Sequence, residues 1–227
     1  MKQNLPDCKK VRYIGNEACG DELRSNGIET IGGTNGDQEF ANGNHLTYED
    51  IKDYQFDEEV GAVITGIDFN VSYSKLALAS MYIQRGAKWI VTNEDGFTIQ
   101  HGYRAPGNGL IIGALESGLK KAGGEGLICE KIVTGKPNPA IFDLIRGQHN
   151  IPESETSKFI MIGDRPDTDI ALGSNGKVDT LLVLSGVVKN EEELQDWAAM
   201  DDKYKPTYVM NSWGEDINLT EEERAKL

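Results

Sequence analysis

Three aspartates that follow an apolar segment are the strongest chemical signal in the sequence. Residues 159–162 are apolar and lead into Gly163, so Asp164 is expected at the carboxyl end of a buried strand, where open α/β sheets place their ligands. Asp167 and Asp169 follow closely. Such an oxygen-rich cluster suits Mg²⁺, a hard cation that keeps several waters and takes one or two carboxylates. The alternative is a loop whose aspartates only cap the next helix.

A cationic residue follows a second apolar segment. Residues 131–134 lead through a glycine into Lys136, and the prolines at 137 and 139 favour a tight turn and a helix start at Ala140. If the two strands are neighbours, Lys136 lies at the same sheet edge as Asp164. A solvated surface charge is the alternative. A lysine beside an acidic metal cluster suits phosphoryl transfer, in which cations neutralise phosphate oxygens.

The elements that must position these residues follow an alternating order. Short β-like runs alternate with helical patterns, which predicts an α/β fold with a largely parallel sheet. The expected strands are residues 11–14, 60–65, 88–92, 131–134, 159–162 and 180–184, and the expected helices include residues 73–85 and 106–119. Residues 32–58 are expected to form a long surface loop. A Gly-rich break at 123–126 predicts two domains, 1–126 and 127–227.

Composition excludes several classes of partner. The chain has 227 residues with 23 basic and 37 acidic side chains, a net charge of −14, so nucleic acid and anionic membrane surfaces are not expected partners. No apolar stretch reaches the length of a membrane span, and residues 1–6 do not resemble a signal peptide. Cys8, Cys19 and Cys129 lack zinc or C-x-x-C spacing, which is typical of thiols in a reducing compartment. The expected location is the cytoplasm.

Several ordered motifs together resemble the haloacid dehalogenase superfamily, in its 4-nitrophenylphosphatase/phosphoglycolate phosphatase branch with a large α/β cap. The resemblance covers roughly residues 8–190. It is carried by Gly66-Ile67-Asp68-Phe69-Asn70-Val71-Ser72-Tyr73-Ser74-Lys75-Leu76, Thr92-Asn93-Glu94-Asp95, Ala105-Pro106-Gly107-Asn108-Gly109, Gly135-Lys136-Pro137, Gly163-Asp164-Arg165-Pro166-Asp167-Thr168-Asp169-Ile170 and Leu182-Val183-Leu184-Ser185-Gly186-Val187.

The resemblance implies a fold and a role for each matching residue. Residues 1–126 match the cap, and residues 127–227 match the carboxyl-terminal half of a Rossmann-like core. In such enzymes the lysine matching Lys136 steadies the phosphate and the nucleophile, the aspartate matching Asp164 binds Mg²⁺, and the one matching Asp169 supports the metal site. The cap closes over the core and contacts the leaving group. The residues expected to bind substrate there, or alternatively to cap strands and helices, are Asp68, Asn93 and Asp95.

One family motif is absent from the sequence. These phosphatases attack phosphorus with the first aspartate of an Asp-x-Asp-Gly motif, and the nearest string here is Asn93-Glu94-Asp95-Gly96. The sequence therefore predicts an intact cap joined to half a core, from a Mg²⁺-dependent phosphatase of small phosphorylated metabolites, and predicts that this chain is inactive. The alternative is a non-catalytic binding or dimerisation protein. A homodimer through the cap is the expected assembly.

Overall fold

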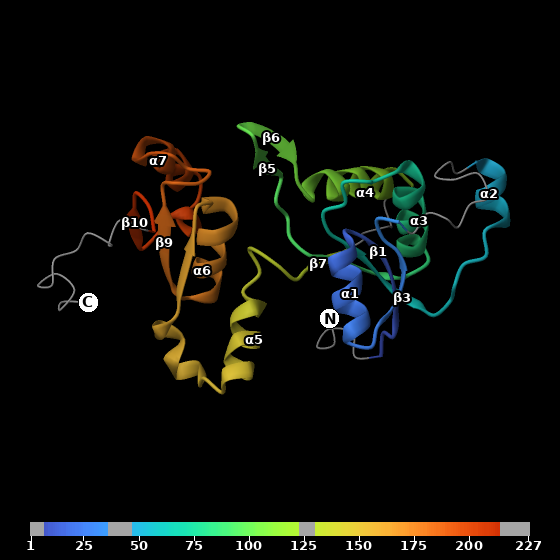
Figure 1. Cartoon of the computed structure of the whole chain (residues 1–227), viewed down its shortest axis with the longest axis horizontal. Helices are drawn as coiled ribbons and strands as arrows, with labels where there is room; N and C mark the ends of the chain where they lie inside the picture. Colours follow the sequence, from blue (N-terminus) through green and yellow to red (C-terminus); the bar gives the residue numbers. More distant parts are fainter. Residues whose placement is uncertain (1–6, 36–46, 123–129, 214–227) are drawn as a thin grey trace, which may run out of the picture. The chain divides into compact units, whose positions relative to one another are not determined.

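The computed structural model describes residues 7–35, 47–122 and 130–213, which form two compact units divided between Thr134 and Gly135 (Figure 1). Each unit has its own sheet and its own buried clusters. No helix within these described ranges combines the length and the apolarity that a membrane crossing requires.

The first unit is built on a five-stranded parallel sheet in the order β2-β1-β3-β4-β7. Its strands alternate with helices as the sequence predicted. The elements are β1 (Lys10–Ile14), α1 (Glu17–Ser25), β2 (Glu29–Gly32), α2 (Tyr48–Asp53), β3 (Val60–Thr65), α3 (Tyr73–Gln84), β4 (Lys88–Val91), β5 (Phe97–Gln100), β6 (Tyr103–Pro106), α4 (Gly109–Ala122) and β7 (Lys131–Val133).

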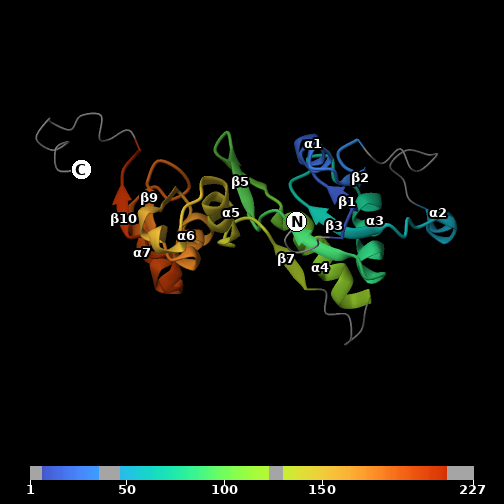
Figure 2. The same cartoon turned by 90° about the horizontal axis from the view of Figure 1, so that it is seen from below.

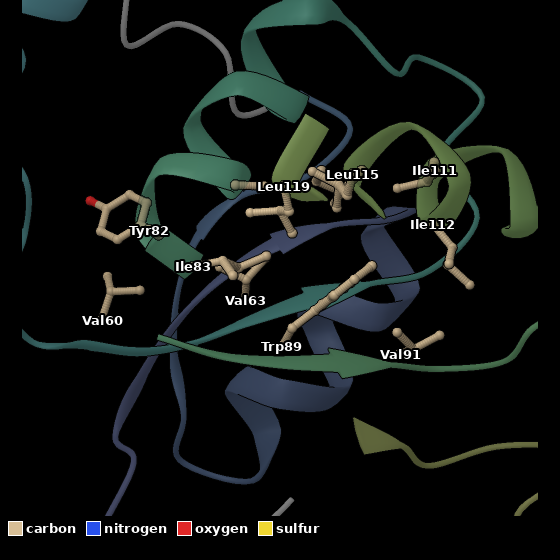
Figure 3. Packing of buried hydrophobic residues seen from close by; sticks show 12 residues of the cluster. Val60, Val63, Tyr82, Ile83, Trp89, Val91, Ile111, Ile112, Leu115 and Leu119 are labelled. Atoms are coloured by element: carbon tan, nitrogen blue, oxygen red, sulfur yellow. The ribbon is translucent and has the colours of Figure 1, made fainter. Parts of the chain in front are cut away.

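Apolar side chains cover both faces of this sheet. Helices α3 and α4 pack on one face over Val63 and Trp89, and α1 lies across the other face (Figure 3). The indole Nε1 of buried Trp89 donates a 3.1 Å hydrogen bond to Thr65 Oγ1, so the one polar atom of this large side chain is satisfied inside the core. This arrangement gives the first unit a complete three-layer core.

A separate hairpin lies between β4 and α4. Strands β5 and β6 pair only with each other, and the hairpin stands apart from the five-stranded sheet in both views (Figures 1 and 2). Its turn is formed by His101 and Gly102, with φ of 50° and 83°. Two successive residues with positive φ match the right-handed twist of the flanking strands. The sequence analysis did not predict this hairpin.

The second unit is built on a three-stranded parallel sheet in the order β10-β9-β8. Phe142, Leu172 and Val178 form one buried cluster, and Ile170, Leu182, Val188 and Leu194 form another. The elements are α5 (Ala140–His149), a 3₁₀ helix (Glu153–Lys158), β8 (Ile160–Gly163), a π-helical turn (Pro166–Ile170), α6 (Ala171–Gly176), β9 (Asp179–Val183), α7 (Glu191–Met200), a 3₁₀ turn (Asp202–Tyr204) and β10 (Tyr208–Met210).

The division between the units differs from the predicted domain boundary. The predicted boundary between residues 126 and 127 falls outside the described residues, and the observed division follows Thr134. The reason is that β7 pairs with β4, Ile132 opposite Ile90. The strand that the sequence analysis assigned to the second domain therefore completes the sheet of the first unit.

Two further expectations need correction. Part of the expected loop at 32–58 is helix α2, which Thr47 and Asp50 begin with a reciprocal capping box; residues 36–46 lie outside the described part. Strand β8 was expected to be buried, yet it is an edge of its sheet and Ile160 is 46% exposed. Its apolar sequence is that of a central strand, but among the described residues it has a neighbour on one side only.

Candidate active site

The turn after β8 is organised around one buried carboxylate. Asp169 Oδ2 accepts hydrogen bonds from the backbone amides of Asp164 (3.2 Å) and Arg165 (3.1 Å). Gly163 permits this close approach, because a Cβ at that position would collide with the Asp169 carboxylate. Asp169 thus folds the loop back on itself and fixes the backbone from which the Asp164 side chain extends.

Lys136 forms an ion pair with the other oxygen of the same carboxylate. Its Nζ lies 3.0 Å from Asp169 Oδ1, with the Asp169 side chain 6% exposed and the Lys136 side chain 36% exposed. The sequence analysis placed Lys136 beside Asp164 on the condition that their strands are neighbours, and this condition is not met, because β7 and β8 belong to different sheets. The lysine instead lies in the short segment between Gly135 and α5, inside the second unit. The Lys136 side chain as a whole is thus partly exposed.

The Asp164 carboxylate is held by the segment that follows β9. Asp164 Oδ2 accepts a 2.7 Å hydrogen bond from the amide of Val187, and the Asp164 carbonyl accepts one of 3.3 Å from the amide of Val188. Gly186 lies so close that a Cβ there would overlap the carboxylate. Gly186 and Val187 belong to a motif that the sequence analysis quoted without giving it a role. Its observed role is to orient Asp164.

The three aspartates of the loop do not converge on one point. Asp167 forms two hydrogen bonds with Arg165, from Nε at 3.2 Å and Nη2 at 2.8 Å, so it does not face the Asp164 carboxylate as a third ligand. No group of three metal-ligating side chains forms anywhere in residues 7–35, 47–122 and 130–213. Because Mg²⁺ requires near-octahedral oxygen coordination, the described residues do not by themselves bring together the oxygen ligands of a complete metal site.

Asp68, expected as a cap residue that meets substrate, is buried in an ion pair. Its Oδ2 lies 2.8 Å from Lys75 Nζ, and its Oδ1 accepts hydrogen bonds from the amide of Asn70 (2.9 Å) and the hydroxyl of Thr34 (3.3 Å). The same lysine donates to the carbonyls of Thr34 and Asn70. Both carboxylate oxygens are thus engaged in joining the loop after β3 to the loop after β2.

Asn93 and Asp95 organise the start of α4. The Asn93 carbonyl accepts a 2.7 Å hydrogen bond from the side-chain amide of buried Asn108, and the Asp95 carbonyl accepts one of 2.9 Å from the amide of Gly109. Asn93 Oδ1 also accepts from the amide of Asp95 at 3.1 Å. The contacts of Asp95 are made by its backbone, and its buried Oδ1 has no hydrogen-bond partner among the described residues. Asp68, Asn93 and Asp95 belong to the first unit, whereas Lys136, Asp164 and Asp169 meet in the second.

Known phosphatases are similar to this chain over nearly its whole length. A family model described as HAD-hydrolase-like matches residues 133–215. Phosphoglycolate phosphatase 2 of Arabidopsis thaliana is 32% identical over 221 residues, which cover 96% of this chain and 67% of that protein. The 4-nitrophenylphosphatase of Schizosaccharomyces pombe is 32% identical over 210 residues, which cover 92% of this chain and 64% of that protein.

Solved structures share the fold. A hypothetical protein from Pyrococcus horikoshii superposes with a TM-score of 0.69 at 28% identity, covering 96% of this chain and 70% of that one. A glycerol phosphate phosphatase from Mycobacterium tuberculosis, crystallised with magnesium, superposes with a TM-score of 0.61 at 24% identity, covering 88% of this chain and 50% of that one. The chain therefore spans between 50% and 70% of the length of these proteins.

Proposed function

The chain belongs to the HAD-like phosphatases of the 4-nitrophenylphosphatase and phosphoglycolate phosphatase branch, and from that membership we propose that it carries the phosphate-positioning half of a phosphatase site for small phosphorylated metabolites. The observation that carries the proposal is the convergence of Lys136, Asp169 and the Asp164 loop in the second unit. A phosphate monoester is the substrate class that a solvent-accessible lysine beside a magnesium-binding carboxylate would suit.

Each of the three residues takes a distinct role in this proposal. Lys136 binds a phosphate oxygen through its ammonium group. Asp169 positions that lysine and the loop amides. Asp164, oriented by Val187, supplies one oxygen ligand to Mg²⁺. When bound, the ion neutralises charge on the phosphoryl oxygens. The glycerol phosphate phosphatase of the same fold, crystallised with magnesium, supports this choice of metal.

The first unit is proposed to act as the cap that selects the substrate. Asp68 would act indirectly, since its buried pair with Lys75 fixes the loop after β3. Asn93 and Asp95 would contact substrate near the start of α4. Their backbone carbonyls accept hydrogen bonds from Asn108 and Gly109 there. The free thiols of Cys8 and Cys19 suit a reducing compartment such as the cytoplasm.

The chain is proposed to be inactive by itself. Phosphate-monoester hydrolysis is among the slowest uncatalysed reactions, with enzymatic enhancements of up to ~10²¹. A lysine and a metal ion do not replace an activated carboxylate that forms a covalent intermediate. The printed sequence has no Asp-x-Asp-Gly motif to provide that carboxylate.

The competing proposal is a non-catalytic binding protein based on the first unit. The observation in its favour is that the first unit has a sheet covered on both faces, whereas the second unit has a partly exposed edge strand. Under this proposal residues 1–134 expressed alone would unfold in one sharp transition and bind phosphorylated metabolites with the affinity of the full chain. Loss of that binding in the fragment would count against it.

A chimera tests the phosphatase proposal. The segment of the Arabidopsis phosphatase that carries the nucleophile would be joined ahead of this chain, and release of phosphate from 4-nitrophenyl phosphate and phosphoglycolate would be measured with and without Mg²⁺. We expect Mg²⁺-dependent turnover that Lys136→Ala and Asp164→Asn abolish. Exposed Lys9→Ala in the first unit is the control and should leave turnover unchanged. Turnover that survives Lys136→Ala would contradict the assigned roles.

A further inference from the structure

A cavity on the second unit is lined by none of the residues of the proposed phosphatase site. It has a volume of about 400 Å³, within the range of pockets that bind small molecules, and it is bordered by α5, the 3₁₀ helix that follows and the end of α6. Lys136, Asp164 and Asp169 do not line it. The cavity is therefore a candidate binding site that the proposed function does not use.

The end of α6 forms one side of this cavity and is held firmly. Gly176 lies against the buried ring of Phe142, where a Cβ would come within 2.4 Å of a ring carbon. Lys177 follows with a positive φ of 56°, which a residue other than glycine adopts at some cost. Asn175 Nδ2 donates a 2.9 Å hydrogen bond to the carbonyl of Pro137, in the segment before α5. These contacts fix the backbone that carries Lys177 at the rim of the cavity.

Arg146 of α5 is a partly buried cation in the cavity lining. Its side chain is 18% exposed, its Nη1 donates a 2.8 Å hydrogen bond to Thr156 Oγ1, and its Nη2 forms an ion pair with Asp143. A guanidinium group has five N–H donors, so donors remain beyond these two contacts. The guanidinium is thus held in one orientation and can still bind a carboxylate.

Two further charged side chains of the lining are unpaired. Glu153 and Lys177 are exposed, and neither side chain forms a hydrogen bond or an ion pair within the part of the chain that the structure describes. With Arg146 and Asp143, the lining therefore holds two cations and two acids. The chain as a whole has 37 acidic and 23 basic side chains, so this balance differs from its general charge. A ligand with one charge would be repelled by half of these groups, whereas a ligand with charges of both signs is attracted by all of them.

We propose that this cavity binds a small zwitterion, an α-amino acid with an apolar side chain. Its carboxylate contacts Arg146 and Lys177, and its ammonium group contacts Glu153. Its side chain lies against Phe142 and Pro139, which give the lining an apolar wall. The proposal does not depend on the phosphatase assignment, because it uses different residues of the second unit.

Titration of the isotope-labelled full chain with L-leucine, followed by nuclear magnetic resonance, tests the proposal. We expect shifts of backbone amides in α5, the 3₁₀ helix and the end of α6, with a dissociation constant in the millimolar range or tighter. N-acetyl-L-leucine lacks the ammonium group and L-leucinamide lacks the carboxylate, so each should bind about tenfold more weakly or worse. Equal binding of L-leucine and either derivative, or no shift at about 10 mM L-leucine, overturns the proposal.

Variants of the two unpaired charges test the assigned contacts. Glu153→Gln and Lys177→Gln should each weaken L-leucine binding about tenfold, because each removes one charged partner of the ligand. Glu155→Gln and Lys158→Gln are the matched controls, since these two side chains pair with each other at 3.0 Å and do not line the cavity. Circular dichroism melts verify that each variant is folded. Lining variants that bind L-leucine as tightly as the controls do would overturn the proposal.

Discussion

Lys136 Nζ lies 3.0 Å from Asp169 Oδ1, and the second oxygen of that carboxylate accepts the amides of Asp164 and Arg165. One buried aspartate thus joins a lysine that precedes α5 to the loop that follows β8. Lys136 and the loop after β8 lie far apart in the sequence, and the Asp169 carboxylate contacts both. The position of the Lys136 ammonium group and the conformation of that loop therefore depend on the same carboxylate.

Replacing that group should destabilise the second unit. In Asp169→Asn, a side-chain amide replaces one acceptor oxygen and leaves either a loop amide or Lys136 without its partner. Loss of a buried acceptor of this kind costs about 1–3 kcal/mol. Urea unfolding would measure it, with Asp143→Asn on exposed α5 surface as the control. Equal stabilities for the two variants would show that Asp169 does not organise the loop.

Breaking the buried ion pair between Lys75 and Asp68 in the first unit should lower stability further than Asp169→Asn does. Lys75→Met leaves the Asp68 carboxylate buried without a countercharge, and breaking a buried pair in this way costs about 3–5 kcal/mol. Thermal unfolding of Lys75→Met against Lys88→Met, an exposed lysine on β4, gives the comparison. Adding Asp68→Asn to Lys75→Met should recover part of the lost stability, because the unpaired buried charge of Asp68 is then removed. No recovery would mean that the two side chains are not coupled.

A second pair in the first unit should give a pH dependence. Lys10 lies 2.7 Å from Asp57 and lowers the pKa of that carboxyl below its ordinary value. A depressed carboxyl pKa stabilises the fold above the ordinary aspartate pKa of about 3.9, and this contribution is lost as the pH falls through the lower, folded value. The stability difference between wild type and Lys10→Met should therefore be largest near neutral pH and shrink in acid. A difference that grows below pH ~4 would have the wrong sign.

Magnesium should bind weakly to the chain alone. Asp164 offers one carboxylate, Lys136 adds repulsion nearby, and Mg²⁺ dehydrates reluctantly. Titration calorimetry should show binding no tighter than the millimolar range, roughly −4 kcal/mol, with little change in Asp164→Asn. Micromolar binding that disappears in Asp164→Asn would mean that a complete site forms in this chain.

The sequence predicted the elements that depend on local pattern. The expected strand at residues 60–65 coincides with β3 (Val60–Thr65), and the helix expected at 73–85 is α3 (Tyr73–Gln84). Apolar runs and helical spacing are local signals, and tertiary contacts did not override them. The hairpin β5–β6 was missed although His101-Gly102 lies between alternating apolar residues, which is a local turn signal.

The sequence could not predict contacts that only the fold creates. Asp164, Asp169 and Lys136 were all singled out, but nothing local indicates that Val187 would hold Asp164 or that Lys75 would neutralise Asp68. The placement of β7 in the first sheet depends on its pairing with β4, which the spacing of strands along the chain does not determine.

We propose that this chain holds Lys136, Asp164 and Asp169 of a phosphatase site without the nucleophile. Release of 4-nitrophenol from 4-nitrophenyl phosphate by the purified full chain, with Mg²⁺ and with a chelator, tests it most directly. We predict a rate indistinguishable from buffer in both conditions and in Asp164→Asn. Mg²⁺-dependent release by the wild-type chain that Asp164→Asn abolishes would contradict the claim, because some other side chain would then be supplying the nucleophile.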